Sequence, residues 1–352
     1  MLSLIASRCT LFLGLLCSAS LAAEAAAEPA DGAAVPARQA AIDAALRFLQ
    51  RHQSPDGLWD VDAYQEQCRD AGPKAEPGRA YTRGAGDIAC TALALLSYFR
   101  AGHLPSEEGP YAAVIDQGLR WLLATQDDRG AFGKRNYEHG MATWALVVAY
   151  DACRDRSLKK PIAGAIKTLL ARQAQHGKQP LGWDYVKPNP NRNDTSVTQW
   201  NLLALSAAAD AGLRVERVLQ QTGAYVLAAC RAARQEQGDW IFPYTWASES
   251  GRVSTHAGAL SGSGLLCAVL TGLDPEDEAV VGLTETAIAM TREDLSLPPC
   301  DGYHLLPVLL ACEGRPVPGG VELVAAAQTQ LIDGQVEQDG CLHGSWDERG
   351  LA

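Results

Sequence analysis

Two kinds of helical segment alternate along this chain, and this alternation constrains the fold more than any other feature. The first kind carries apolar residues at helical spacing on one face only. The second kind is apolar nearly all round and rich in small residues, which predicts helices buried on every side. Segments of the first kind are expected at 40–53, 112–126, 161–173, 218–235, 279–290 and 321–332. Segments of the second kind are expected at 87–102, 139–153, 194–212, 256–272 and 303–314.

The repeating unit is therefore a helical hairpin with one amphipathic outer helix and one buried inner helix. The polar residues that open the buried segments lie 52, 55, 62 and 48 positions apart. Stacked hairpins of alternating direction place the inner helices parallel to one another and inside the outer set. We predict an all-α fold, an (α/α)-barrel toroid with six outer and five inner helices in which the last inner helix is missing. A solenoid is the alternative, although its repeats are usually shorter, at about 34 to 47 residues.

A recurring turn follows several of the outer segments. A Gln at the end of the segment precedes a turn that contains Gly, and an aromatic residue comes next. We expect the aromatic ring to fold back over the helix end and the Gln amide to bond the turn backbone. The turns are QSPDGLW at 53–59, QDDRGAF at 126–132, QEQGDW at 235–240 and a less regular stretch that ends in GSW at 344–346.

The N-terminal region reads as a targeting segment. Arg8 precedes an apolar run with a small-residue exit, so we predict a signal peptide at 1–22, an Ala/Pro-rich linker at 23–37, and a secreted or periplasmic protein. A lipid anchor on Cys17 is a second interpretation. It is disfavoured because Leu16, and not a small residue, comes directly before Cys17. The toroid domain is expected at 38–352, C-terminally incomplete because GSWDERGLA stands where a sixth inner helix would begin.

Composition narrows the classes of protein. The chain is 47% apolar with a net charge of −11 and lacks a long Lys/Arg run, which excludes a nucleic-acid binder. Of its ten Cys, eight lie beyond the expected signal peptide, and sequence alone does not fix their pairing. The Cys within apolar helical runs are expected to be buried thiols: Cys90, Cys153, Cys267 and Cys312. The better disulfide candidates lie in loops: Cys68, Cys300 and Cys341.

The turn motifs, together with LGWDYVKPNPNRNDTSVTQWNLLAL at 181–205 and the terminal GSWD, resemble the prenyltransferase and squalene-oxidase repeat proteins. The resemblance covers about residues 38 to 347 and is greatest to the secreted bacterial branch. It implies the terpenoid-cyclase α/α toroid, whose central cavity takes an apolar or isoprenoid-like ligand. Fold alone does not establish activity.

One departure from that family bears on catalysis. Cyclases of this fold that protonate an alkene carry a DxDD motif, in which the middle Asp is the acid. The corresponding stretch here is Asn191-Arg192-Asn193-Asp194, so an amide occupies the acid position at Asn193. We therefore expect no DxDD-type cyclisation. Protein prenyltransferases hold zinc with Asp, Cys and His, and Cys300, Asp301 and His304 offer these residue types at a different spacing, as a weak zinc candidate. No other cofactor is expected.

Polar residues at the leading ends of the inner segments form the candidate catalytic set. If these helices are parallel, their leading ends face one opening, where carboxylates and imidazoles together offer acid–base chemistry. The alternative is that the Asp residues cap helix N-termini and the His residues bond nearby turns. The set is Asp87, His139, Asp194 and His256.

A second set of residues is expected to bind the ligand. Aromatic rings in the 181–205 stretch could line an entrance for a flat or apolar molecule, or could instead staple a long loop. The set is Trp183, Tyr185, Trp200 and His304.

Two functional hypotheses follow. In the first, the ring is a non-catalytic exported binder of an apolar small molecule or lipid. In the second, it is an enzyme of the prenyltransferase and terpene cyclase superfamily that acts on an isoprenoid with the Asp/His set. A missing inner helix would also leave apolar flanks of the first and fifth inner helices uncovered, which predicts a protein partner or self-association at the open ring.

Overall fold

The computed structural model describes residues 34–74, 84–247, 250–255, 260–296 and 302–346. Within these ranges the chain forms eleven α-helices, two short 3-10 helices at Tyr64–Glu66 and Arg156–Leu158, and two small antiparallel sheets. The prediction of an all-α fold is confirmed. None of the described helices combines the length and the apolar character that crossing a membrane requires.

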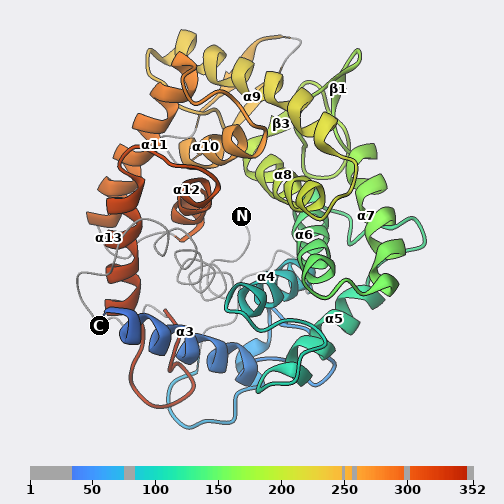
Figure 1. Cartoon of the computed structure of the whole chain (residues 1–352), viewed down its shortest axis with the longest axis vertical. Helices are drawn as coiled ribbons and strands as arrows, with labels where there is room; N and C mark the ends of the chain where they lie inside the picture. Colours follow the sequence, from blue (N-terminus) through green and yellow to red (C-terminus); the bar gives the residue numbers. More distant parts are fainter. Residues whose placement is uncertain (1–33, 75–83, 248–249, 256–259, 297–301, 347–352) are drawn as a thin grey trace.

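Six helices run around the outside of the molecule (Figure 1). Each buries one face, as α5 does with Ile115, Gly118 and Leu122, which are three and four residues apart. The first begins at Ala34, so 34–37 is helical where a linker was expected; Pro36 lies in its first turn, where a missing N–H costs no helical bond. The outer helices are α3 (Ala34–Arg51), α5 (Ala112–Ala124), α7 (Lys159–Ala171), α9 (Glu216–Gln237), α11 (Glu278–Ser296) and α13 (Gly320–Asp333).

Five helices lie inside this outer set (Figure 1). Each contacts the next along the chain, and α4 buries every residue from Ala89 to Phe99. Because an outer helix returns the chain after each inner one, the inner helices share one direction, and we call the end where they begin the mouth. The inner helices are α4 (Asp87–Arg100), α6 (Asn136–Cys153), α8 (Thr195–Asp210), α10 (Ser261–Leu270) and α12 (Gly302–Gly314).

The first and last hairpins meet at a seam. Helix α13 contacts α3, so the outer row returns to its start. Between the inner helices α12 and α4, Arg100 and Glu313 form an ion pair of 2.5 Å. Residues 305–311 of α12 are buried, like the interior of α4. Self-association or partner binding at this seam stays a prediction.

Gln side chains join three of the recurring turns to the next outer helix. The amide of Gln53 donates to the carbonyls of Gly57 in its own turn and Val114 in α5, both at 2.9 Å. Gln126 does the same for Gly130 and Pro161, at 3.1 and 2.9 Å. At the seam the pattern recurs.

At the seam, Gln335 donates to Gly344 in its own turn and to Ala41 in α3, at 3.1 and 2.9 Å. The junction between the last and first hairpins thus uses the same bonds as the internal junctions. Gln173 is a variant, since it bonds the Leu181 carbonyl and the Thr222 hydroxyl of α9.

The aromatic residue of the turn seals the end of the preceding helix. The indole N–H of Trp59 donates to the Leu49 carbonyl at 2.8 Å, and Trp183 donates in the same way to Leu169 at 2.9 Å. Gly57 in the first turn has φ +102°, and a Cβ there would lie 2.3 Å from the Gln117 carbonyl oxygen. This turn therefore requires glycine.

Two small antiparallel sheets lie in the connections between helices. One pairs β1 (Gln175–His176) with β2 (Gln179–Pro180). The other has the order β3 (Asn193–Asp194), β4 (Thr245–Ala247) and β5 (Arg252–Ser254), with Asp194 opposite Thr245. This three-stranded sheet stands directly before α8 and fixes the backbone at the mouth.

Candidate functional site

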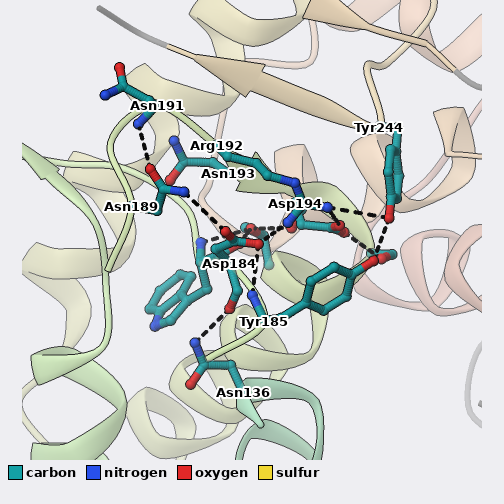
Figure 2. Close-up of polar contacts among 12 residues, drawn as sticks. Asn136, Asp184, Tyr185, Asn189, Asn191, Arg192, Asn193, Asp194 and Tyr244 are labelled. Atoms are coloured by element: carbon teal, nitrogen blue, oxygen red, sulfur yellow. Dashed lines mark hydrogen bonds and ion pairs between the residues drawn. The ribbon is translucent and has the colours of Figure 1, made fainter. Parts of the chain in front are cut away.

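A cluster of charged and aromatic side chains surrounds Arg192 at the start of α8 (Figure 2). We define the Arg192 cluster as Arg192 with Asp184, Tyr185, Asp194 and Tyr244. The guanidinium bridges the two carboxylates, since Nη1 pairs with Asp184 and Nη2 lies 3.1 Å from Oδ2 of Asp194. About a third of the Arg192 side chain, 32%, is exposed, whereas that of Asp194 is fully buried.

Tyrosine rings enclose the guanidinium. Its carbon lies 4.6 Å from the centre of the Tyr185 ring and 5.8 Å from that of Tyr244, both within cation–π range. The hydroxyls of these two tyrosines bond each other. Tyr137 of α6 stacks on Tyr185 at 5.9 Å between ring centres, and its hydroxyl bonds the Ser196 hydroxyl. Together with Tyr137 of α6 and Ser196 of α8, the cluster thus brings side chains of two inner helices against the segments before α8 and β4.

Asp194 is a buried carboxyl with several donors. The Ser196 hydroxyl donates to Oδ1 at 2.5 Å, and Arg192, Tyr244 and Tyr185 also bond the carboxylate. Burial nevertheless raises the pKa of Asp194 above its usual value, because desolvation outweighs these favourable partners. Asp194 precedes α8 without capping it through its side chain. The carboxyl can therefore hold a proton more readily than an exposed Asp.

Backbone contacts fix the loop that carries the cluster. The amide side chain of Asn136, at the start of α6, donates to the Asp184 carbonyl at 2.6 Å, and its backbone N–H donates to the Tyr185 carbonyl at 2.8 Å. Asp194 N–H bonds the Trp183 carbonyl at 2.8 Å. The loop is thereby held against α6 on one side and β4 on the other.

His139 does not face the mouth, which corrects the prediction for this residue. It is fully buried; Nδ1 accepts the Phe132 N–H at 3.1 Å, and Nε2 donates to the Ala165 carbonyl of α7 at 2.9 Å. Burial lowers its pKa to about 4, so the imidazole is neutral.

The bond to His139 recurs with other acceptors in other hairpins. In each case a side chain of an inner helix accepts the backbone N–H of the turn aromatic. The further pairs are Trp59 to Thr91 at 3.1 Å, Trp183 to Thr198 at 3.0 Å and Phe242 to Ser261 at 3.3 Å. His139 therefore corresponds to Thr198 and not to Asp194, one helical turn away from the position that spacing had assigned.

Asp87 opens α4 as expected, but it belongs to another group of carboxylates. Its Oδ1 accepts the Val61 N–H at 3.0 Å, and it makes no side-chain cap. Burial raises its pKa to about 6, with smaller contributions from the charges of Asp60, Asp62 and Glu138. Burial also raises the pKa of Glu138. Half-buried Asp87 therefore titrates near pH 6, well above an exposed Asp.

The expected ligand-binding residues separate into different roles. Tyr185 lies in the Arg192 cluster, whereas Trp183 is fully buried and seals α7, so the entrance role predicted for it is wrong. Trp200 is buried against Trp144, with ring centres 6.2 Å apart. His304 lies half-buried in the first turn of α12.

Some predicted residues cannot be placed. His256, Cys300 and Asp301 lie outside the described residues, so the weak zinc candidate with His304 stays a prediction. Sequence reasoning missed Arg192, Asp184, Tyr244, Tyr137 and Ser196. The signal for Arg192 was present, because it is one of the two cations of the loop 184–194, with Lys187, and lies two residues before Asp194.

Comparisons with known proteins show the fold alone. No family model matches this chain, and no curated protein matches it in sequence. A solved helical structure described as a novel alpha-amylase from Clostridium perfringens is similar, with a TM-score of 0.60. The two chains are 13% identical over 87% of this chain and 90% of that one.

Proposed function

We propose that the protein is an exported, terpenoid-cyclase-like ring that binds an apolar or isoprenoid-like ligand at its mouth, without DxDD-type cyclisation. The observation that carries the proposal is the convergence of Tyr137, Tyr185, Tyr244 and a partly exposed guanidinium at the start of α8. Tyrosines combine an apolar face with a polar tip, which suits the boundary between a wet opening and an apolar interior.

An aromatic stripe supports an apolar ligand. On α6, Tyr137, Met141 and Trp144 are four and three residues apart and therefore share one face. Trp200 lies one turn beyond Ser196 on α8 and contacts Trp144. Met141, Trp144 and Trp200 are buried, so the polar cluster continues into the apolar interior. A polar end beside an apolar interior is the pattern that suits an amphiphile.

The residue at the family's acid position supports binding without cyclisation. Asn193 is buried, and its amide nitrogen donates to the Trp246 carbonyl at 3.3 Å. An amide has no proton of suitable acidity to protonate an alkene. Asp194 beside it is engaged by Arg192, Ser196 and the tyrosines, which favours a positioning role for its carboxylate.

The test is ligand retention and binding. The purified full chain is extracted with organic solvent, and the extract is analysed by mass spectrometry for isoprenoids. Farnesol is then titrated against the extracted protein by intrinsic fluorescence. We expect Tyr185→Ala to weaken binding at least tenfold, and Tyr150→Phe, near the other end of α6, to leave it unchanged. An extract without isoprenoid, together with no binding of farnesol, would contradict the proposal.

Carbohydrate hydrolysis is the second candidate, favoured by the name of the similar Clostridium perfringens structure. Glycoside hydrolysis requires two carboxyl groups that flank the scissile bond, and Asp184 and Asp194 lie on either side of one guanidinium. Release of reducing sugar from soluble starch, abolished by Asp194→Asn, would favour this candidate over the first.

Export rests on the sequence of residues 1–22 alone. N-terminal sequencing of the secreted protein should give a chain that starts after Ala22 or Ala23. A protein that keeps Met1 and stays in the cytoplasm would contradict export without bearing on the ligand.

A further inference from the structure

Three buried side chains of metal-ligating type meet at the seam, outside the Arg192 cluster. They are His52 at the end of α3, Cys68 in the loop after the first 3-10 helix, and Cys341 in the loop after α13. One ligand atom from each lies within 4.8 Å of the other two. The first and last hairpins of the chain thus contribute to one group.

The imidazole of His52 is oriented toward the sulfur. Its Nδ1 lies 2.7 Å from the Phe48 carbonyl oxygen and therefore donates to it, while Nε2 lies 3.3 Å from Sγ of Cys341. A backbone carbonyl bound to one ring nitrogen is the usual way to present the other nitrogen to a metal. Phe48 also packs against the ring at 4.0 Å between centres, which fixes its plane.

Neighbouring contacts hold the two cysteines in place. The Cys341 N–H bonds the Ala71 carbonyl at 3.4 Å, and Lys74 Nζ donates to the Cys68 carbonyl at 2.7 Å. Arg51 pairs with Asp70 at 3.0 Å and donates to the His343 carbonyl at 2.7 Å. The two loops are therefore fixed to each other as well as to α3.

We propose that His52, Cys68 and Cys341 bind one zinc ion at the seam, with water or a backbone carbonyl as the fourth ligand. In tetrahedral zinc, bonds of about 2.3 Å to sulfur and about 2.0 Å to nitrogen place those two atoms roughly 3.5 Å apart. The 3.3 Å between Nε2 and Cys341 Sγ fits this edge. Each thiol loses its proton on coordination, and two thiolates balance the charge of Zn²⁺.

The alternative use of the sulfurs is a Cys68–Cys341 disulfide. Neither cysteine forms a disulfide in the structure. A disulfide would occupy both sulfurs and would give no role to an imidazole directed at one of them. The zinc ion explains all three residues together and clips the last hairpin to the first, where a ring of hairpins is most easily opened.

The first experiment is metal analysis of the full chain, purified under reducing conditions from zinc-containing medium. We expect one zinc per chain, a fall to less than a tenth in Cys68→Ser and Cys341→Ser, and no change in Cys153→Ser, which replaces a half-buried thiol outside the group. Removal of zinc with a chelator should lower the melting temperature of the wild-type chain, and added zinc should restore it.

Cobalt substitution keeps the proposal testable if a variant folds poorly. Wild-type protein loaded with Co²⁺ should show thiolate-to-cobalt absorption and the visible bands of a tetrahedral site, and His52→Gln should shift those bands. A metal-free wild-type chain, no cobalt spectrum, or a Cys68–Cys341 disulfide in peptides mapped without reductant would each overturn the proposal. None of these results bears on ligand binding at the Arg192 cluster.

Discussion

The recurring turns and the Arg192 cluster are both polar regions next to an inner helix, yet they differ in how often they occur. The turn bond is made by Thr91, His139, Thr198 and Ser261 in four different hairpins. The Arg192 cluster occurs beside α8 alone among the described inner helices. A polar residue that recurs at the same place in a hairpin serves the fold, whereas a polar group found in one hairpin is the better candidate for function.

The largest expected effect is that of His139→Ala on stability. The variant leaves the Phe132 N–H and the Ala165 carbonyl buried without partners and opens a cavity, so we expect a loss of about 3 kcal/mol. Urea unfolding at pH 7.5 measures it. His176→Ala, on an exposed strand, is the control and should change stability by about 0.5 kcal/mol or less.

The pH dependence sharpens this prediction. The folded-state pKa of His139 is lowered to about 4, so between pH 6.5 and 4 the unfolded chain binds a proton that the folded chain does not. The wild-type advantage over His139→Ala should therefore shrink as the pH falls through this window. A full loss of ligand binding with unchanged stability would instead place His139 in the site and break the comparison.

Arg192→Gln should cost less stability, with a pH dependence of its own. It leaves the buried Asp194 carboxylate without its cation, and we expect a loss of about 2 kcal/mol at pH 8. Burial already raises the pKa of Asp194, and removal of the guanidinium raises it further. The loss should be smaller at pH 5 than at pH 8, because protonation of the carboxyl removes the buried charge that lacks its cation.

Arg120→Gln is the matched control for this variant. The Arg120–Asp116 pair of α5 is exposed, so the control should change stability by about 0.5 kcal/mol or less. Equal losses for Arg192→Gln at pH 5 and pH 8 would show that packing, and not charge, is what Arg192 contributes.

Gln126→Ala and Gln335→Ala test whether the seam equals an internal junction. Each variant removes two hydrogen bonds that the Gln side-chain amide donates to backbone carbonyls. We expect the free energy of unfolding to fall by about 1 to 2 kcal/mol. Denaturant midpoints of the two variants should agree. A much smaller loss for Gln335→Ala would mean that the seam contributes less than the internal junctions.

The smallest effect is a gain from Asp87→Asn. The folded-state pKa of Asp87 is raised to about 6, so the folded state loses stability as pH rises from 4 to 6. Since the carboxyl is only half-buried, we expect the variant to be more stable by about 1 kcal/mol at pH 8 and equal at pH 4. Asp116→Asn should show no such crossover, and a less stable Asp87→Asn at pH 8 would contradict the desolvation argument.

The sequence predicted the repeated features well, because each is encoded locally and several times. The helical period, the small residues of the inner helices, and the turn with Gln, Gly and an aromatic all carry signals that reinforce one another. Gln53 and Trp59 make the bonds expected from their place in the turn. Element boundaries were less certain: α6 begins at Asn136, three residues before the expected start.

The site was harder to predict because it depends on contacts between distant residues. Tyr244 reaches Arg192 through the pairing of β3 with β4, and no local pattern announces that pairing. His139 was misplaced because a polar residue near a helix start resembles Asp194 in a spacing argument. Only the bond from Phe132 shows that it stands one turn further along. A polar residue near a helix start is therefore weak evidence for a site at the mouth, because spacing alone does not fix its place to within one helical turn.

The hydrogen bonds of Gln335 to Ala41 and Gly344 hold the last hairpin to the first in the same way as neighbouring hairpins are held to each other. The fold therefore does not depend on which hairpin comes first in the chain. A circular permutant that links residue 346 to residue 34 and opens at the exposed turn around Gly177 would keep every inner and outer neighbour. Such a chain would also bring His52 and Cys341 close together in sequence. The two residues could then meet before the rest of the chain is synthesised.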